Sequence, residues 1–193
     1  MTVQRDVVVK QLADVKVENQ EGIINAYNVM VNVLPVTFWN NFAKRILEAV
    51  PSENHDRVEA GLVKCANECG YHTGYGIITS DEFQAVVEPM VTEGAKDILR
   101  GAYAVFTAWG WAKSGIVQIK EGDRMVVRAV DYYEADGEPG EKRAFMIRGV
   151  SAAFFDLAYS EPYPNGLGKY TCEQVTGIEK GDPFGEFVVM KKS

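Results

Sequence analysis

The spacing of hydrophobic and polar positions changes along the chain. Between about residues 37 and 102, apolar side chains recur three or four positions apart, which is typical of amphipathic helices. After residue 102 the chain has short apolar runs separated by turn residues, and this pattern indicates strands. We therefore expect a helical first part, followed by a hairpin, one more helix and a second hairpin.

The first part predicts a peripheral segment and then a helix. Residues 1–22 are polar and charged apart from short valine runs, and they indicate a mobile arm or a peripheral strand. Residues 23–35 are strand-like. Residues 37–50 predict a helix, because apolar side chains recur every four positions from Phe38 to Val50 and a proline follows.

Two polar pairs predict where the next helices begin. Asp56 and Glu59 have the spacing of a capping box, in which each side chain accepts a hydrogen bond from the backbone N–H of the other residue. Thr79 and Glu82 repeat this spacing. The helix that starts there should break or kink near Pro89, because proline lacks a backbone N–H and clashes with the preceding turn.

Two hairpins and a helix are expected in the second part. Residues 105–133 contain two apolar runs joined by a Lys-Glu-Gly-Asp turn, which is a hairpin signal. Residues 142–159 predict a helix in which Gly149 and Ala153 form a strip of small side chains, so that another element can approach closely. Residues 169–192 predict a closing hairpin. This order of elements indicates an α+β fold with helices packed on an antiparallel sheet.

The composition excludes some classes of partner. The 193 residues are 47% hydrophobic, enough for one domain with its own core, and the net charge is -7. Nucleic acids and anionic membranes are not expected partners, because both need concentrated lysine and arginine.

The sequence has no apolar run of about 18 residues and no signal peptide, and its three cysteines form no disulfide framework. We therefore expect a cytoplasmic protein.

Two of the three cysteines and one of the two histidines lie close together in the second predicted helix. Cys65, Cys69 and His72 stand at i, i+4 and i+7 and therefore on one side of that helix. Three interpretations stay open: a metal site completed by His55, Cys172 or a carboxylate, a Cys/His nucleophile, or a buried core face. Free cysteine is among the most buried residue types, so a buried face is favoured and no cofactor is predicted.

Three motifs of the second part occur together in one known family. They are Trp109-Gly110-Trp111 before the first hairpin, RGVSAAFFD in the helix, and EQVTGIEKGDPFGEF near the end. In this order they resemble the 4-vinyl-reductase-type domain, which also occurs in phenol- and xylene-responsive transcription activators. The resemblance extends over residues 60–190, and its specific motifs lie in residues 109–187.

The resemblance implies an α+β fold distantly related to TRAPP subunits, often dimeric, with a hydrophobic pocket between helices and sheet. Residues 1–55 would be an N-terminal extension and first helix, packed on the same domain as the ligand-binding residues 56–193. Many family members bind a structural zinc through cysteines, and the matching positions here are Gly177 and Gly185. Glycine cannot coordinate a metal, so the resemblance implies a stand-alone binding module without the family's zinc site.

The aromatic residues then become a candidate ligand site. Aromatic side chains at helical spacing usually form plain core, but the resemblance favours a pocket that holds a small hydrophobic or aromatic molecule. The candidate ligand-binding residues are Tyr71, His72, Tyr75, Phe106, Trp109, Trp111, Phe154 and Tyr159. We expect a homodimeric binding protein; the alternatives are an enzyme that uses Cys65, Cys69 and His72, and a non-catalytic assembly subunit.

Overall fold

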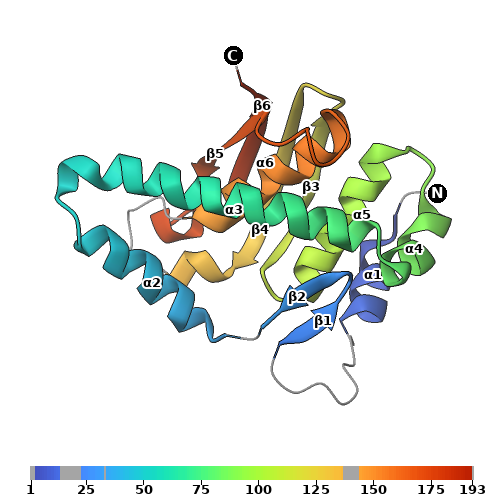
Figure 1. Ribbon diagram of the computed structural model, residues 1–193, viewed down its shortest axis with the longest axis horizontal. Helices are drawn as coiled ribbons and strands as arrows, with labels where there is room; N and C mark the ends of the chain where they lie inside the picture. Colours follow the sequence, from blue (N-terminus) through green and yellow to red (C-terminus); the bar gives the residue numbers. More distant parts are fainter. Residues whose placement is uncertain (1–2, 14–22, 33, 137–143, 193) are drawn as a thin grey trace.

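The computed structural model describes residues 3–13, 23–32, 34–136 and 144–192 of the chain (Figure 1). Its α-helices are α1 (Arg5–Leu12), α2 (Val36–Glu48), α3 (His55–Ile78), α4 (Asp81–Val87), α5 (Ala95–Ala108) and α6 (Phe145–Tyr159). Short 3-10 turns are η1 (Ser52–Asn54), η2 (Glu88–Met90), η3 (Tyr133–Asp136) and η4 (Ile178–Lys180). The strands are β1 (Ile24–Ala26), β2 (Val29–Val31), β3 (Ala112–Lys120), β4 (Arg124–Tyr132), β5 (Tyr170–Thr176) and β6 (Gly185–Lys191).

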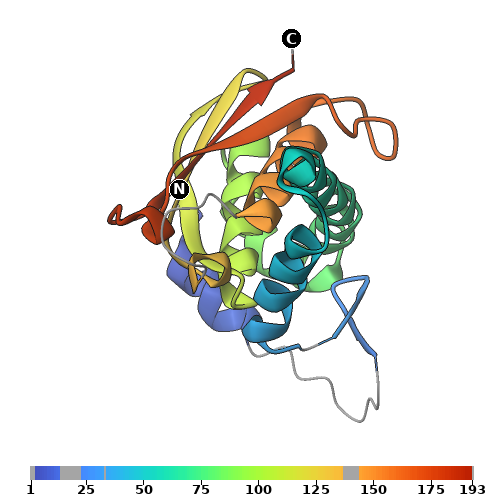
Figure 2. The same cartoon turned by 90° about the vertical axis from the view of Figure 1, so that its left-hand side faces the viewer.

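Strands β3, β4, β6 and β5 lie side by side in this order and form an antiparallel sheet. Helices α5 and α6 cover one face of the sheet, and α3 packs along α6 as a further layer (Figure 2). Hairpin β1–β2 forms a separate small sheet. The predicted α+β fold, with helices packed on an antiparallel sheet, is confirmed.

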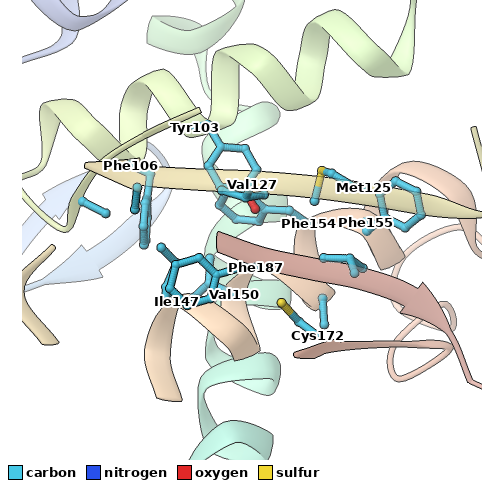
Figure 3. Packing of buried hydrophobic residues seen from close by; sticks show 14 of the residues in the cluster. Tyr103, Phe106, Met125, Val127, Ile147, Val150, Phe154, Phe155, Cys172 and Phe187 are labelled. Carbon is cyan, nitrogen blue, oxygen red and sulfur yellow. The ribbon is translucent and has the colours of Figure 1, made fainter. Parts of the chain in front are cut away.

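The main core lies between the sheet and helices α5 and α6 (Figure 3). Met125 and Val127 of β4 point to the same side, because alternate residues of a strand share a face. Phe187 of β6 lies opposite Val127 in the strand register. The hydroxyl of Tyr103 on α5 donates a hydrogen bond to Oγ of Ser151 on α6 at 2.7 Å. The buried polar groups that join the two helices are thereby satisfied.

Helices α3 and α6 approach each other most closely at glycines. A Cβ atom on Gly149 of α6 would lie 2.5 Å from the carbonyl oxygen of Val63 and 2.6 Å from the backbone nitrogen of Asn67. A Cβ atom on Gly70 of α3 would lie 2.9 Å from Cα of Val150. The predicted close approach of another element at the small-residue strip of α6 is therefore confirmed.

Helix α1 corrects one prediction. Arg5–Leu12 form a helix, where the sequence pattern predicted a mobile arm or a peripheral strand. The helix packs against α5 and buries Val8 and Leu12. A run of three valines conceals the helical spacing, because consecutive β-branched residues are typical of strands. The rest of the predicted arm, residues 14–22, and residues 1–2 lie outside the described residues.

Neither predicted capping box forms. Helix α3 begins at His55 without a side-chain cap, and Glu59 pairs with an arginine of α6 instead. Helix α4 is capped by Ser80, one position after the predicted Thr79, and the Ser80 hydroxyl accepts a hydrogen bond from the backbone N–H of Phe83 at 3.2 Å. Both predicted helices exist, but the residues that start them differ from the prediction.

The remaining predicted elements agree with the structure. They are helix α2, the break between α4 and α5, hairpin β3–β4, helix α6 and hairpin β5–β6. The strand-like residues 23–35 contain hairpin β1–β2, where Tyr27 and Asn28 adopt the positive φ angles of 51° and 58° that a two-residue turn requires. Among the described residues, no helix combines the length and apolar character needed to cross a membrane.

Candidate ligand-binding site

A cavity of about 370 Å³ separates helix α2 from α3, η3 and the start of α6, and we name it the α2 cleft. Its volume lies within the range of roughly 300–1,000 Å³ that is usual for small-molecule sites. The apolar part of its lining consists mainly of Trp39, Phe42, Ala43, Leu62, Ala66, Phe145 and Met146. The cleft is therefore large enough, and apolar enough, to enclose a small hydrophobic molecule.

Helix α2 forms an outer wall that is only loosely joined to the protein body. Its strongest apolar face carries Trp39 and Phe42, yet these side chains remain 38% and 48% exposed. No residue of α2 is buried. The side-chain amide of Asn40 donates a hydrogen bond to the carbonyl oxygen of Tyr133 at 3.0 Å and fixes the helix over η3. The exposed rings of Trp39 and Phe42 thus remain available for contacts with another molecule.

The polar end of the α2 cleft is the carboxyl group of Glu134, which also caps helix α6. Its two oxygens accept hydrogen bonds from the backbone N–H groups of Met146 at 2.8 Å and Ile147 at 3.1 Å. Burial raises the pKa of Glu134 to about 7, although the backbone hydrogen bonds act in the opposite direction. Burial and the adjacent Glu134 also raise the pKa of Tyr133 well above its ordinary value. This end of the cleft thus offers a carboxyl group that can hydrogen bond, and Lys44 of α2 also lines the cleft.

Four of the predicted aromatic residues surround a second, much smaller space, the aromatic cavity. Phe106, Trp109, Trp111 and Phe154 line it together with Cys69 of α3. Its volume is about 30 Å³. A cavity needs at least ~10–15 Å³ for one water, so this space holds about two waters and no aromatic ligand. The structure brings these four residues together, but Phe106 packs against Trp111 and Phe154, and Trp109 packs against Tyr27.

Three other predicted residues, Tyr71, His72 and Tyr75, gather around Tyr163 in the segment between α6 and β5. The ring of Tyr75 stacks on Tyr163 at 3.8 Å between centroids, and Nδ1 of His72 lies 2.9 Å from the Tyr163 hydroxyl. The buried Tyr71 hydroxyl accepts a hydrogen bond from the backbone N–H of Gly166 at 3.0 Å. These side chains attach the segment to α3 and line neither the α2 cleft nor the aromatic cavity.

The last predicted residue, Tyr159, lies apart from both groups. Its ring packs 4.8 Å from Phe155 at the end of α6. Phe154 lines both the aromatic cavity and an apolar groove of about 190 Å³ formed by α3, α5 and α6. The predicted ligand-binding residues therefore fall into three places.

The predicted burial of Cys65 and Cys69 is wrong, because both thiols are exposed. Cys65 lines the α2 cleft, whereas Cys69 lies 3.8 Å from the hydroxyl of Thr73. The buried face of α3 instead carries small residues such as Ala66 and Gly70, one position further round the helix. Within the part of the chain that the structure describes, no three His, Cys, Asp or Glu side chains are grouped so that they could hold a metal.

Apart from Cys65, the residues of the α2 cleft were not singled out from the sequence as a candidate site. One signal was present in the sequence, the apolar stripe of α2 that includes Phe38 and Phe42. The structure shows that neither ring is buried. Glu134 gave no signal, because its partners Met146 and Ile147 lie 12 and 13 positions later in the sequence and only the tertiary structure brings them together. The cleft can be recognised only once α2 is placed against α3.

Comparison with known proteins supports the fold. No protein-family model matches the chain, and no curated protein matches it by sequence. The structure is similar to the phenol-responsive sensory domain of the transcription activator PoxR, crystallised with phenol. The TM-score is 0.71 at 12% identity, over 97% of this chain and 89% of that chain.

A second similar structure is a trafficking protein particle complex subunit 3 from Naegleria fowleri, covalently bound to palmitic acid. The TM-score is 0.56 at 15% identity, over 82% of this chain and 93% of that chain. At these identities the two likenesses show the fold alone. They confirm the resemblance to the 4-vinyl-reductase-type and TRAPP-subunit fold that the sequence motifs indicated.

Proposed function

We propose that this protein binds a small, uncharged hydrophobic molecule, aromatic or aliphatic, in the α2 cleft. The observation that carries the proposal is the cleft of about 370 Å³ beneath an apolar helix face with no buried residue. A bound molecule would cover Trp39 and Phe42, which are otherwise 38% and 48% exposed. Two proteins of the same fold, one crystallised with phenol and the other carrying palmitic acid, add support.

The polar groups of the cleft indicate the class of ligand. Most of the lining is apolar, while Glu134 and Tyr133 can hydrogen bond to one polar group of the ligand. A carboxylate placed beside Glu134 would bring two like charges into a poorly solvated space. We therefore favour a neutral molecule, such as a phenol or an alcohol, over a fatty acid anion at this end of the cleft.

Calorimetric titration with 4-butylphenol tests the proposal. We expect binding to the unmodified protein and about tenfold weaker binding to Ala43→Phe, because the added ring occupies the cleft from its α2 wall. Decanoate serves as the anionic comparison and should bind more weakly at pH 8. The melting temperature, measured with and without ligand, provides a second readout.

Cys69→Leu is the matched control, because the substituted side chain would fill the aromatic cavity and leave the α2 cleft unchanged. This variant should bind 4-butylphenol as well as the unmodified protein does. If Cys69→Leu lost binding and Ala43→Phe did not, the ligand would bind among the predicted aromatic residues and not in the α2 cleft. No binding of any phenol or alcohol to the unmodified protein would refute the proposal.

A second candidate function is covalent capture of an acyl group by Cys65. Its exposed thiol opens onto the α2 cleft, where an acyl chain would find apolar lining. In such a step the sulfur attacks an acyl thioester, a new C–S bond forms, and the donor thiol leaves with the proton. Intact-mass measurement after incubation with palmitoyl-thioester should show one added acyl group, absent in Cys65→Ser. Equal labelling of both proteins would contradict this candidate.

An enzyme built on Cys65, Cys69 and His72 together has less support. The nearest partner of His72 is Tyr163 and that of Cys69 is Thr73, so the three side chains do not act on one another.

Homodimer formation, a cytoplasmic location and the division at residue 55 remain predictions from the sequence and its resemblance. A non-catalytic assembly subunit remains compatible with the exposed rings of α2.

A further inference from the structure

A cysteine at either of the two glycines at the family's metal positions would displace neighbouring side chains. A Cβ atom on Gly177 would lie 2.6 Å from Nε2 of Gln174 and 2.6 Å from Oε1 of Glu179. A Cβ atom on Gly185 would lie 2.8 Å from the ring of Tyr132. The space beside both glycines is therefore filled by three large polar side chains from other positions.

These three side chains form one hydrogen-bonded group. The Tyr132 hydroxyl and the Gln174 amide both donate to the carboxylate of Glu179. The Tyr132 hydroxyl in turn accepts a hydrogen bond from the backbone N–H of Ile178 at 3.1 Å. The three residues are only 3–5% exposed. A buried carboxylate is tolerated when such donors surround it.

The group joins three elements that are separate in the sequence. Tyr132 ends β4, Gln174 lies in β5, and Glu179 lies in η4. The turn between β5 and β6 is closed by its own bonds as well, since the backbone N–H of Gly177 donates to the side chain of Asp182 at 2.9 Å. Side-chain hydrogen bonds with Tyr132 and Asp182 thus both hold this turn.

The chemistry at this position is also unsuited to zinc. A structural zinc site uses about four ligands, mostly thiolates and imidazoles. Cys172 is the nearest cysteine in the sequence, but it is buried in the main core, and burial raises the pKa of its thiol to about 12. Among the described residues no group of three candidate ligands occurs here or elsewhere. The residues present do not fit the metal that the fold family implies.

We propose that Tyr132, Gln174 and Glu179 form a metal-free clamp that holds the β5–η4–β6 turn on β4, in the place where relatives of this fold use zinc. The protein therefore folds without zinc and gains no stability from it. This inference is independent of the proposed ligand, because the clamp residues do not line the α2 cleft.

Metal analysis of the purified protein and its melting temperature with and without EDTA test the clamp. We expect no stoichiometric zinc and no shift of the melting temperature with the chelator. Stoichiometric zinc together with a lower melting temperature in EDTA would overturn the proposal. This measurement uses the unmodified protein and so does not depend on the folding of any variant.

Substitution provides the second arm of the test. Tyr132→Phe should lower the melting temperature by about 5 °C, because the Glu179 carboxylate and the Ile178 N–H each lose a buried partner. Tyr170→Phe is the matched control, since that buried tyrosine gives up a single hydrogen bond to the carbonyl oxygen of Gly122. Equal melting temperatures of the two variants would also overturn the clamp.

Discussion

A single methyl group added at Gly149 is expected to lower the free energy of unfolding by about 3 kcal/mol. The new Cβ atom would lie 2.5 Å from the carbonyl oxygen of Val63 and 2.6 Å from the backbone nitrogen of Asn67. Backbone atoms of a helix cannot move aside as a flexible side chain can, so α3 and α6 must separate. Urea unfolding of Gly149→Ala, followed by circular dichroism, measures the loss.

Gly61→Ala is the matched control for this prediction. Gly61 lies on the exposed side of α3, and a Cβ atom there would meet nothing within 4 Å. Alanine in a helix interior is more favourable than glycine by about 1 kcal/mol, so this variant should be slightly more stable. If Gly149→Ala were as stable as Gly61→Ala, the close approach of α3 and α6 would be contradicted.

The stability of the protein is expected to fall as the pH rises through the titration of Glu134. Burial raises the pKa of this carboxyl group from 4.5 to about 7 in the folded protein. The folded state therefore favours the protonated form. Its contribution is fully present below pH 4.5, declines as the pH rises to about 7, and is absent above that. The shift corresponds to a loss on the order of 3 kcal/mol across this window.

Urea unfolding of the unmodified protein and of Glu134→Gln between pH 5 and pH 8 measures this effect. The glutamine variant lacks the titrating group and should be less stable at pH 5, because its amide nitrogen cannot accept a bond from the α6 backbone. The difference between the two proteins should shrink toward pH 8. Glu173→Gln, at an exposed site, is the control. A difference that stays constant with pH would contradict the prediction.

Glu134 also connects the proposed site to the core. The same carboxyl group lines the α2 cleft and accepts hydrogen bonds from Met146 and Ile147 at the start of α6. A ligand that hydrogen bonds to Glu134 would act on the start of a helix that packs against both the sheet and α3. Ligand binding and the pH dependence of stability should therefore be coupled through one side chain.

Much of the fold could be predicted from local patterns. The helical period of residues 37–50, the turn at residues 120–123 and the strip around Gly149 correspond to α2, the β3–β4 hairpin and the α3–α6 contact. Each of these signals depends only on residues that lie close together in the sequence. Helix α1 escaped prediction because tertiary packing against α5 outweighed the strand preference of its valines.

The site could be predicted only in part. Phe106, Trp109 and Trp111 do lie together, as their closeness in the sequence suggested, but they enclose only about 30 Å³. Whether aromatic rings leave a cavity depends on how closely their helices approach. The larger space lies under α2, where rings that a hydrophobicity pattern would assign to a core remain half exposed.

Apart from helix α1, the order of helices and strands follows from the amino-acid sequence, as do the α+β class and the absence of cysteines at Gly177 and Gly185. Which face of α3 is buried depends instead on the tertiary structure. Cys65 and Cys69 have the spacing of a buried stripe, but α6 comes so close that only small residues such as Gly70 fit between the helices. That distance between two backbones is set by packing across the whole molecule, and no local pattern of hydrophobic and polar residues encodes it.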